Sequence, residues 1–230
     1  MRSKNNLEVK AEERTYSSLF RGIFNLLLEK GLKSLTMDFV ASSLSISKRT
    51  LYEKFVSKTD MVVKTMSFMA DRRREVSEEI FKKGSNSLVS ILQVYYIQRN
   101  FICSVNKRFF DDMDYLFRDV KEYYKGESDK DCKYISGRFY NGVREGLFRD
   151  DVDYIRQVRI LNLQFESLKR MEDKFPRNLT LEESFDVIYG NFINGIVTEK
   201  GRLLLDEISK EKELIVKEIE KYLYKNEQKN

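Results

Sequence analysis

A single proline, Pro176, occurs in a chain of 230 residues, and this scarcity constrains the fold more than any other feature of the sequence. Proline breaks helices and collects in loops, so its near absence predicts long, uninterrupted helices. Alternating strand-like runs are also missing. Because hydrophobic residues make up 41% of the chain, the helices have enough apolar surface to build a core. The sequence therefore predicts an all-α protein.

Several residue types that carry chemistry are absent or few. There is no histidine, which removes the commonest general base and the commonest zinc ligand. The two cysteines, Cys103 and Cys132, are not spaced as a metal or redox pair, and we expect both to be reduced, structural thiols. We therefore predict no enzyme, no metal and no cofactor. An enzyme with a helical fold stays an alternative, which metal analysis of the purified protein would test.

Nothing in the sequence points to export or to a membrane. Residues 1–6 lead into a charged stretch without an apolar signal region. No run of the chain approaches the ~20 apolar residues that cross a bilayer. We expect a cytoplasmic protein without a membrane partner.

Apolar spacing, caps and glycines predict the helices. The first is expected at about 8–30, where apolar residues recur every three or four positions, and Gly31 suits a left-handed cap behind it. Breaks are expected at 84–86 and at Gly126, and Thr180 with Glu183 is typical of a capping box. The remaining helices are expected at about 37–44, 48–55, 58–83, 87–103, 107–121, 128–145, 152–175, 180–198 and 200–225.

Two features single out the N-terminal region. Residues 1–60 hold 11 Lys and Arg against 7 Asp and Glu, so most of the net charge of +5 lies there, as suits a polyanionic partner. Three N-cap residues, Thr36, Ser47 and Ser57, stand about ten residues apart and bound two short helices joined by the turn 43–46. This spacing predicts a helix-turn-helix, whose second helix enters the major groove of DNA.

The faces of this second helix predict separate roles for its side chains. At 100° per residue, Leu51 and Phe55 lie together and are expected to face the core with Ile46, Phe39 and Val40. Three side chains that point away from that core are predicted to read base edges: Arg49, Thr50 and Glu53. Residues on the flanks and at helix starts are predicted to bind phosphates: Thr36, Ser47, Lys48, Tyr52, Lys54 and Lys58.

The stretch from 27 to 58, with the sequence Ser-Lys-Arg-Thr-Leu-Tyr-Glu-Lys-Phe at 47–55, resembles the DNA-binding domain of TetR-type regulators. The resemblance covers about 18–63. The sequence departs from the family at Ser45, where glycine is frequent, at Arg49, where a small residue is frequent, and at Val56, where proline is common. The resemblance implies an all-helical homodimer whose C-terminal domain binds a small molecule, usually with release of DNA.

On this resemblance we expect a helix-turn-helix DNA-binding domain at 1–57, a connecting helix at 58–84 and a ligand-binding and dimerisation domain at 85–230. The expected function is that of a repressor released by a small-molecule effector from double-stranded DNA with a pseudo-palindromic operator. Activation and corepression stay open. A helical protein-interaction module without DNA binding is the alternative. More loosely, 143–152 and 195–201 resemble segments of regulators from Bacteroides-like bacteria.

The resemblance also implies where a second copy would bind. The helices expected at Val152–Phe175 and Thr180–Thr198 would pair with their copies as a four-helix dimer interface. Gly190 and Gly195 would allow close approach, and packing within one chain is the alternative. The apolar residues expected to supply the interface are Ile160, Leu161, Leu163, Leu168, Phe185, Ile188, Tyr189, Phe192, Ile193 and Ile196.

Aromatic residues are frequent in the middle of the chain, which predicts a hydrophobic effector pocket there. A plain aromatic core is the alternative for each of these residues, and no ligand is implied. The residues expected to line the pocket are Tyr95, Phe109, Tyr115, Phe139 and Phe165, with Gln98 or Asn106 as polar contacts.

Overall fold

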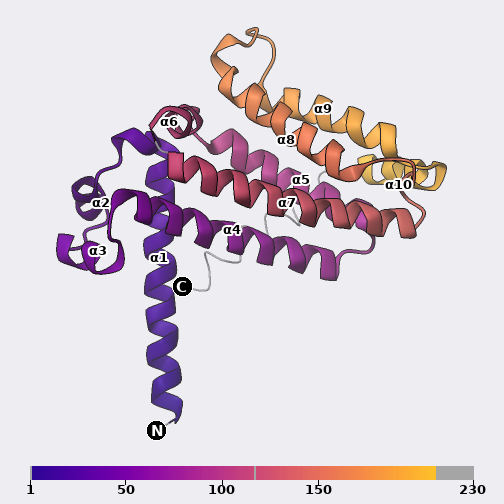
Figure 1. The fold of residues 1–230 in the computed structure, drawn as a ribbon. Helices are drawn as coiled ribbons and strands as arrows, with labels where there is room; N and C mark the ends of the chain where they lie inside the picture. The colour runs from indigo at the N-terminus through magenta and orange to yellow at the C-terminus, as the bar shows by residue number, and fades with distance from the viewer. Residues whose placement is uncertain (1, 117, 211–230) are drawn as a thin grey trace. The chain divides into compact units, whose positions relative to one another are not determined.

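The computed structural model describes residues 2–116 and 118–210, and it confirms that the protein is all-α. A short 3-10 turn, Glu172–Lys174, follows α8. No helix within the described ranges is long and apolar enough to span a membrane. The helices, drawn in Figure 1, are α1 Arg2–Ser34, α2 Met37–Ser43, α3 Lys48–Lys54, α4 Lys58–Lys83, α5 Ser87–Ser104, α6 Arg108–Leu116, α7 Arg118–Arg144, α8 Tyr154–Arg170, α9 Leu181–Ile196 and α10 Glu199–Lys210.

The described chain divides into two compact units. The first unit holds residues 2–73 and 105–125, apart from 117, and the second holds 74–104 and 126–210. Both α4 and α7 begin in the first unit and end in the second, whereas α6 lies wholly in the first. The sequence did not predict that the chain returns to its N-terminal unit after α5.

Most predicted helix limits are confirmed, and α4 runs over the predicted 58–83. The prediction was wrong around Gly126, because α6 ends at Leu116 and α7 continues through Gly126 to Arg144. A lone glycine costs a helix only ~1 kcal/mol relative to alanine, so it does not by itself end one. Of the last predicted helix, 200–225, α10 reaches Lys210, and 211–225 lie outside the described residues.

Gly31 interrupts α1 shortly before the helix-turn-helix. Its φ of 77° and ψ of 173° are not helical, so the positive φ of the expected cap is confirmed but the ψ is extended. A Cβ there would lie 3.0 Å from the Asp112 carboxylate and 3.3 Å from the Arg108 Cβ. Glycine is therefore required both by the backbone angle and by the close approach of α6.

The core of the first unit forms between α1, α2, α3 and the start of α4. Ile23, Leu27, Leu51 and Phe55 have no exposed surface. The Phe20 ring packs edge-on against the Phe55 ring, with centroids 5.8 Å apart. Each such side chain contributes roughly 1.5–3 kcal/mol when it leaves water. This burial fixes α3 against α1, and Figure 1 shows α2 and α3 beside α1.

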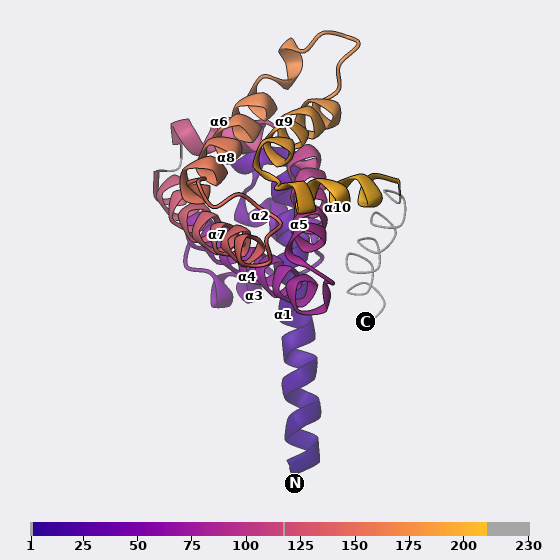
Figure 2. The same cartoon turned by 90° about the vertical axis from the view of Figure 1, so that its right-hand side faces the viewer.

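The core of the second unit lies among α5, α7, α8 and α9. The Phe139 ring stacks on the Tyr154 ring at 5.2 Å with Phe148 beside them, and Phe185 is fully buried against Phe165 in the same cluster. Helices α8 and α9 run side by side in the views of Figures 1 and 2. One face of each thus packs inward, within the unit.

Segments 143–152 and 195–201, which the sequence singled out separately, pair with each other in the second unit. The Arg149 amide donates to the Ile196 carbonyl at 2.8 Å, and the Thr198 amide donates to the Leu147 carbonyl at 3.0 Å. A Cβ at Gly201 would collide with the Leu147 carbonyl oxygen. These bonds join the residues just before α8 to the end of α9.

Candidate nucleic-acid interface

The two short helices of the interface begin at the predicted caps. The Thr36 and Ser47 hydroxyls each accept a hydrogen bond from the amide three residues later, at 3.1 and 3.0 Å. The Ser57 hydroxyl does the same at 3.2 Å for the start of α4. Because each cap satisfies an otherwise unpaired amide, the three residues fix where α2, α3 and α4 start. The three predicted N-caps are confirmed.

The turn between α2 and α3 contains a strained residue. Ser45 has a φ of 53°, and it is the single non-glycine residue with a positive φ among the described residues. The turn closes with a hydrogen bond of 3.0 Å from the Ile46 amide to the Ala41 carbonyl. This is the position where TetR-type domains often carry glycine, so the serine keeps the glycine conformation at the cost of strain.

The anchoring of α3 follows the prediction for most residues. Leu51, Phe55 and Val40 are fully buried, as expected. Phe39 is not: its side chain is 37% exposed, and Ile46 is half-buried. The prediction for Phe39 was wrong because Met37, Val40 and Ala41 form the inward face of α2. At 100° per residue, Phe39 lies about opposite Met37.

The three predicted base-reading residues lie on the outer side of α3, but they are not independent. The Arg49 Nε donates to Glu53 Oε1 at 2.9 Å, and the two side chains are 89% and 60% exposed. Thr50 is half-buried, and its hydroxyl shares a hydrogen bond of 2.8 Å with the Ser47 hydroxyl. The residues expected to touch bases therefore already have partners on their own helix.

Most predicted phosphate-binding residues lie on the exposed rim of the same helix. Tyr52 is 54% exposed. The Lys48 ammonium pairs with Asp38 of α2 at 2.8 Å, and the Lys54 ammonium lies 4.4 Å from the centre of the Tyr16 ring. These contacts hold the cations at the rim of α3 while leaving them near solvent.

Lys58 has a different environment from the one expected. Its ammonium donates to the Lys33 carbonyl at 3.2 Å, inside the first unit. Burial lowers the pKa of Lys58, and the nearby Asp112 carboxylate partly offsets this effect. Asp112 also accepts a hydrogen bond of 2.6 Å from the Lys33 amide. Lys58 and Asp112 together hold the end of α1.

Two residues that the sequence did not single out hold the end of α3. The Lys64 ammonium donates to the Lys54 carbonyl at 3.3 Å and to the Asp60 carboxylate at 2.9 Å. Asp60 in turn accepts from the Val56 amide at 3.0 Å. The hydrogen bond from Lys64 is the main reason why the pKa of Asp60 is lowered. In the sequence, this pair looks like any other ion pair four residues apart on a helix.

The residues expected to line an effector pocket are divided between the two units. Tyr95 and Phe165 are buried in the second unit with ring centroids 6.1 Å apart, whereas Phe109 is buried in the first unit. Phe139 packs with Tyr154, as described above. The Tyr115 side chain lies outside the described residues. Their packing among other rings matches the aromatic-core alternative.

Asn106, expected as a polar contact of the effector, instead binds the backbone of α1. Its amide group donates to the Glu29 carbonyl at 3.2 Å, and its backbone amide donates to the Leu28 carbonyl at 3.0 Å. Asn106 thus satisfies two carbonyls near the end of α1, within the first unit.

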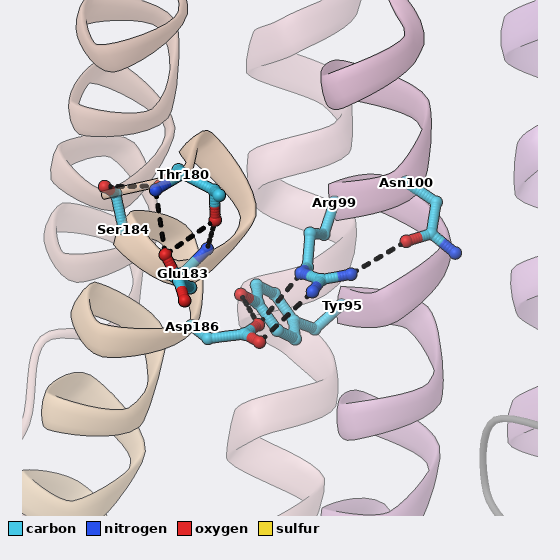
Figure 3. A network of polar contacts seen from close by, with 7 residues as sticks. All are labelled: Tyr95, Arg99, Asn100, Thr180, Glu183, Ser184 and Asp186. Carbon is cyan, nitrogen blue, oxygen red and sulfur yellow. Dashed lines mark hydrogen bonds and ion pairs between the residues drawn. The ribbon is translucent and has the colours of Figure 1, made fainter. Parts of the chain in front are cut away.

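A polar network in the second unit joins α5 to α9 (Figure 3). The Tyr95 hydroxyl donates to Asp186 Oδ1 at 2.9 Å, and the Arg99 guanidinium pairs with the same carboxylate at 2.9 Å. Burial raises the pKa of Tyr95, which therefore donates as a neutral phenol. Tyr95 also stacks on Tyr189 with ring centroids 3.6 Å apart. No pattern in the sequence pointed to this network, because Tyr95 and Arg99 lie about 90 residues from Asp186.

Both cysteines are free thiols, as expected. Burial raises the pKa of Cys103 to about 12 and also raises the pKa of Cys132. At neutral pH both are therefore almost entirely protonated, the unreactive form.

Residues 19–65 match the family profile of the bacterial regulatory proteins of the tetR family. The matched segment begins within α1, contains α2, the turn and α3, and ends within α4. No curated protein matches the sequence.

Solved structures with the same fold cover most of the chain. A TetR-family transcriptional regulator from Agrobacterium tumefaciens has a TM-score of 0.65 at 14% identity, over 81% of this chain and 99% of its own. Reduced NemR from E. coli has a TM-score of 0.66 at 15% identity, over 80% and 97%. A regulator from Saccharomonospora viridis, in complex with choline, has a TM-score of 0.59 at 14% identity, over 81% and 100%. At these identities the likeness shows a shared fold.

Proposed function

We propose that this chain is a DNA-binding transcriptional regulator of the kind whose family profile residues 19–65 match, and that it is a homodimeric repressor which a small-molecule effector releases from its operator. The observation that carries the proposal is the exposed outer face of α3, held by the buried Leu51 and Phe55. Arg49 lies on this face, and Lys48, Tyr52 and Lys54 lie on its rim. Regulators of this kind are generally not enzymes, and we propose no catalytic role. We place its action in the cytoplasm.

We assign the first contacts to DNA as follows. Arg49 and Thr50 are proposed to meet base edges, and the rim residues Lys48, Tyr52 and Lys54 to meet phosphates. Thr36 and Ser47 cap helices whose first amides can also meet phosphate oxygens. Lys58 is left out of this set because its partly buried ammonium donates to the Lys33 carbonyl inside the first unit, whereas the Lys48 side chain is 64% exposed.

A second copy is proposed to cover the outer faces of α8 and α9. Ile160, Leu163 and Val187 are 51%, 63% and 59% exposed on these helices. A Cβ on Gly190 or Gly195 would meet nothing within 4 Å in the chain itself. Since each glycine costs a helix ~1 kcal/mol without any gain in packing here, close approach of another helix gives a reason for them. Leu161, Phe185, Tyr189, Ile193 and Ile196, also expected at the interface, are instead buried within the chain.

An effector is proposed to bind within the predicted ligand-binding domain, 85–230. Support comes from the shared fold, because one regulator with this fold is in complex with choline. In a dimer, the two α3 helices must have the spacing of the two half-sites. An effector that binds better to a conformation with another spacing would shift the population toward it and lower the affinity for DNA. The effector itself and the sign of the response would be found by screening small molecules for a change in operator binding.

The test is a binding assay with the full chain and duplex DNA from its own upstream region. We expect salt-sensitive binding to a pseudo-palindromic site with half-sites about one helical turn apart. Lys48→Ala should weaken binding to all sequences about equally and reduce the salt dependence, as expected for a phosphate contact. Binding to no DNA sequence at low salt would instead favour the protein-interaction module.

A further inference from the structure

The ion pair between Arg49 and Glu53 bears on how the helix recognises a base. We propose that Glu53 reads no base itself but positions the Arg49 guanidinium, which reads a guanine. This inference rests on the proposed function, because it concerns the same helix in the same groove. It replaces the expectation that Glu53 accepts a hydrogen bond from cytosine.

The geometry of the guanidinium supports this role. An arginine side chain has five N–H donors in a flat fork, one on Nε and two on each Nη. Glu53 Oε1 accepts from Nε at 2.9 Å. With 89% of the side chain exposed, the Nη groups remain open to solvent. Two parallel Nη–H donors match the O6 and N7 acceptors of guanine in the major groove. Glu53 thus holds one part of the fork and leaves the reading edge open.

Charge favours the same assignment. A lone carboxylate brought into the major groove would be repelled by the surrounding phosphates, whereas the Arg49–Glu53 pair carries no net charge. An exposed pair of this kind contributes little to folding stability. Its value here lies in reducing the rotamer freedom that Arg49 would otherwise lose on binding.

The experiment compares wild type, Arg49→Ala, Glu53→Ala, Glu53→Gln and the double variant, all as full chains. Each is selected on randomised duplex DNA and then measured against single base-pair changes in the enriched site. The control is Glu122→Ala. On α7, the Arg118 Nε donates to Glu122 at 3.0 Å, and the Arg118 and Glu122 side chains are 88% and 65% exposed. The control variant therefore removes a closely matched ion pair that lies outside α3.

We expect Glu53→Ala to reduce discrimination about 3- to 10-fold at the one base pair that Arg49→Ala also affects. Binding to unrelated DNA should not fall, because a negative charge has been removed. The double variant should discriminate no worse at that pair than Arg49→Ala alone, and Glu53→Gln, which can still accept from Nε, should restore part of the preference. Glu122→Ala should leave the preference unchanged.

Other outcomes separate the two ideas. If Glu53→Ala affects a different base pair, or if its effect adds fully to that of Arg49→Ala, the positioning role is overturned while the proposed function stands. If the wild-type chain enriches no sequence, the proposed function and this role both fail.

Discussion

The backbone conformation of Ser45 matters more for stability than the chemistry of its side chain. Its φ of 53° lies in the left-handed region, which costs an L-residue roughly 1–2 kcal/mol. The turn closes with the hydrogen bond from the Ile46 amide to the Ala41 carbonyl and leads into the capped start of α3. The strain is therefore stored in the turn that joins α2 to α3.

We expect Ser45→Gly to stabilise the protein. Glycine relieves the strain, but it also makes the unfolded chain more flexible, which lowers the free energy of unfolding by about 0.5–1 kcal/mol. The net gain in stability should therefore be up to about 1 kcal/mol. Urea unfolding followed by circular dichroism measures it. Ser43→Gly, in the last turn of α2, is the control and should lose stability, because its backbone is helical. A loss in Ser45→Gly as large as in the control would show that the turn carries no strain.

Single residues near the interface were predictable when one helix decided their environment. Helical spacing alone placed Leu51 and Phe55 inward, and side-chain chemistry alone identified Thr36 and Ser47 as caps. Lys58 could not be placed in this way. A lysine that follows a cap looks the same in sequence whether its ammonium faces a phosphate or the Lys33 carbonyl of another helix.

At the scale of elements, helices predominate because the sequence gives them both periodicity and caps. The predicted starts of α3, α4 and α9 are confirmed because a capping side chain marks each of them. The break expected at Gly126 was wrong because glycine was the only signal available, and α7 runs through this residue. Packing also escapes the sequence: Asp112 of α6 and Asn106, just before it, both bind the backbone of α1.

Helix α7 meets α4 through a cluster of charges in the second unit. Glu127 is 9% exposed, pairs with Arg74 and accepts from the Lys130 ammonium at 2.6 Å. Arg74 also donates to Asp131 at 3.0 Å. Burial acts to raise the pKa of Glu127, but the hydrogen bonds from Lys130 and Arg74 prevail and lower it.

This cluster predicts a pH dependence of stability. Because the pKa of Glu127 is lower in the folded state, its stabilisation is present above the unfolded-state pKa of about 4.3 and is lost as pH falls through the folded value. Glu127→Gln should therefore cost about 1–3 kcal/mol near neutral pH, and the gap to wild type should narrow as pH falls below about 4.3. Urea titrations at neutral and acidic pH measure it. Glu122→Gln, an exposed change on the same helix, should change stability little at neutral pH.

At the scale of the whole molecule, the proposed function depends on symmetry. A single α3 would cover one half-site, and two copies held at a fixed spacing would cover a pseudo-palindrome. The exposed apolar side chains of α8 and α9 would then be as important for DNA binding as the interface residues of α3.

Leu163→Asp should break the proposed dimer, because the two-fold axis places the new charge in the interface twice. We expect a monomer by light scattering, unchanged helix content and a loss of operator binding of at least about tenfold. Leu203→Asp is the control, since Leu203 is 65% exposed on α10 and outside the proposed interface. A variant that stays dimeric would move the interface elsewhere.

The return of α6 to the first unit limits how this protein can be cut into fragments. A fragment that ends after α4 would keep α2 and α3 but lose Asn106 and Asp112, which bind the backbone of α1 from Leu28 to Lys33. The carbonyls and the amide released there would have to find water, and the buried Gly31 would lose its cover. Anyone isolating the DNA-binding part for crystallisation or spectroscopy should therefore add 105–125 through a linker rather than shorten the chain.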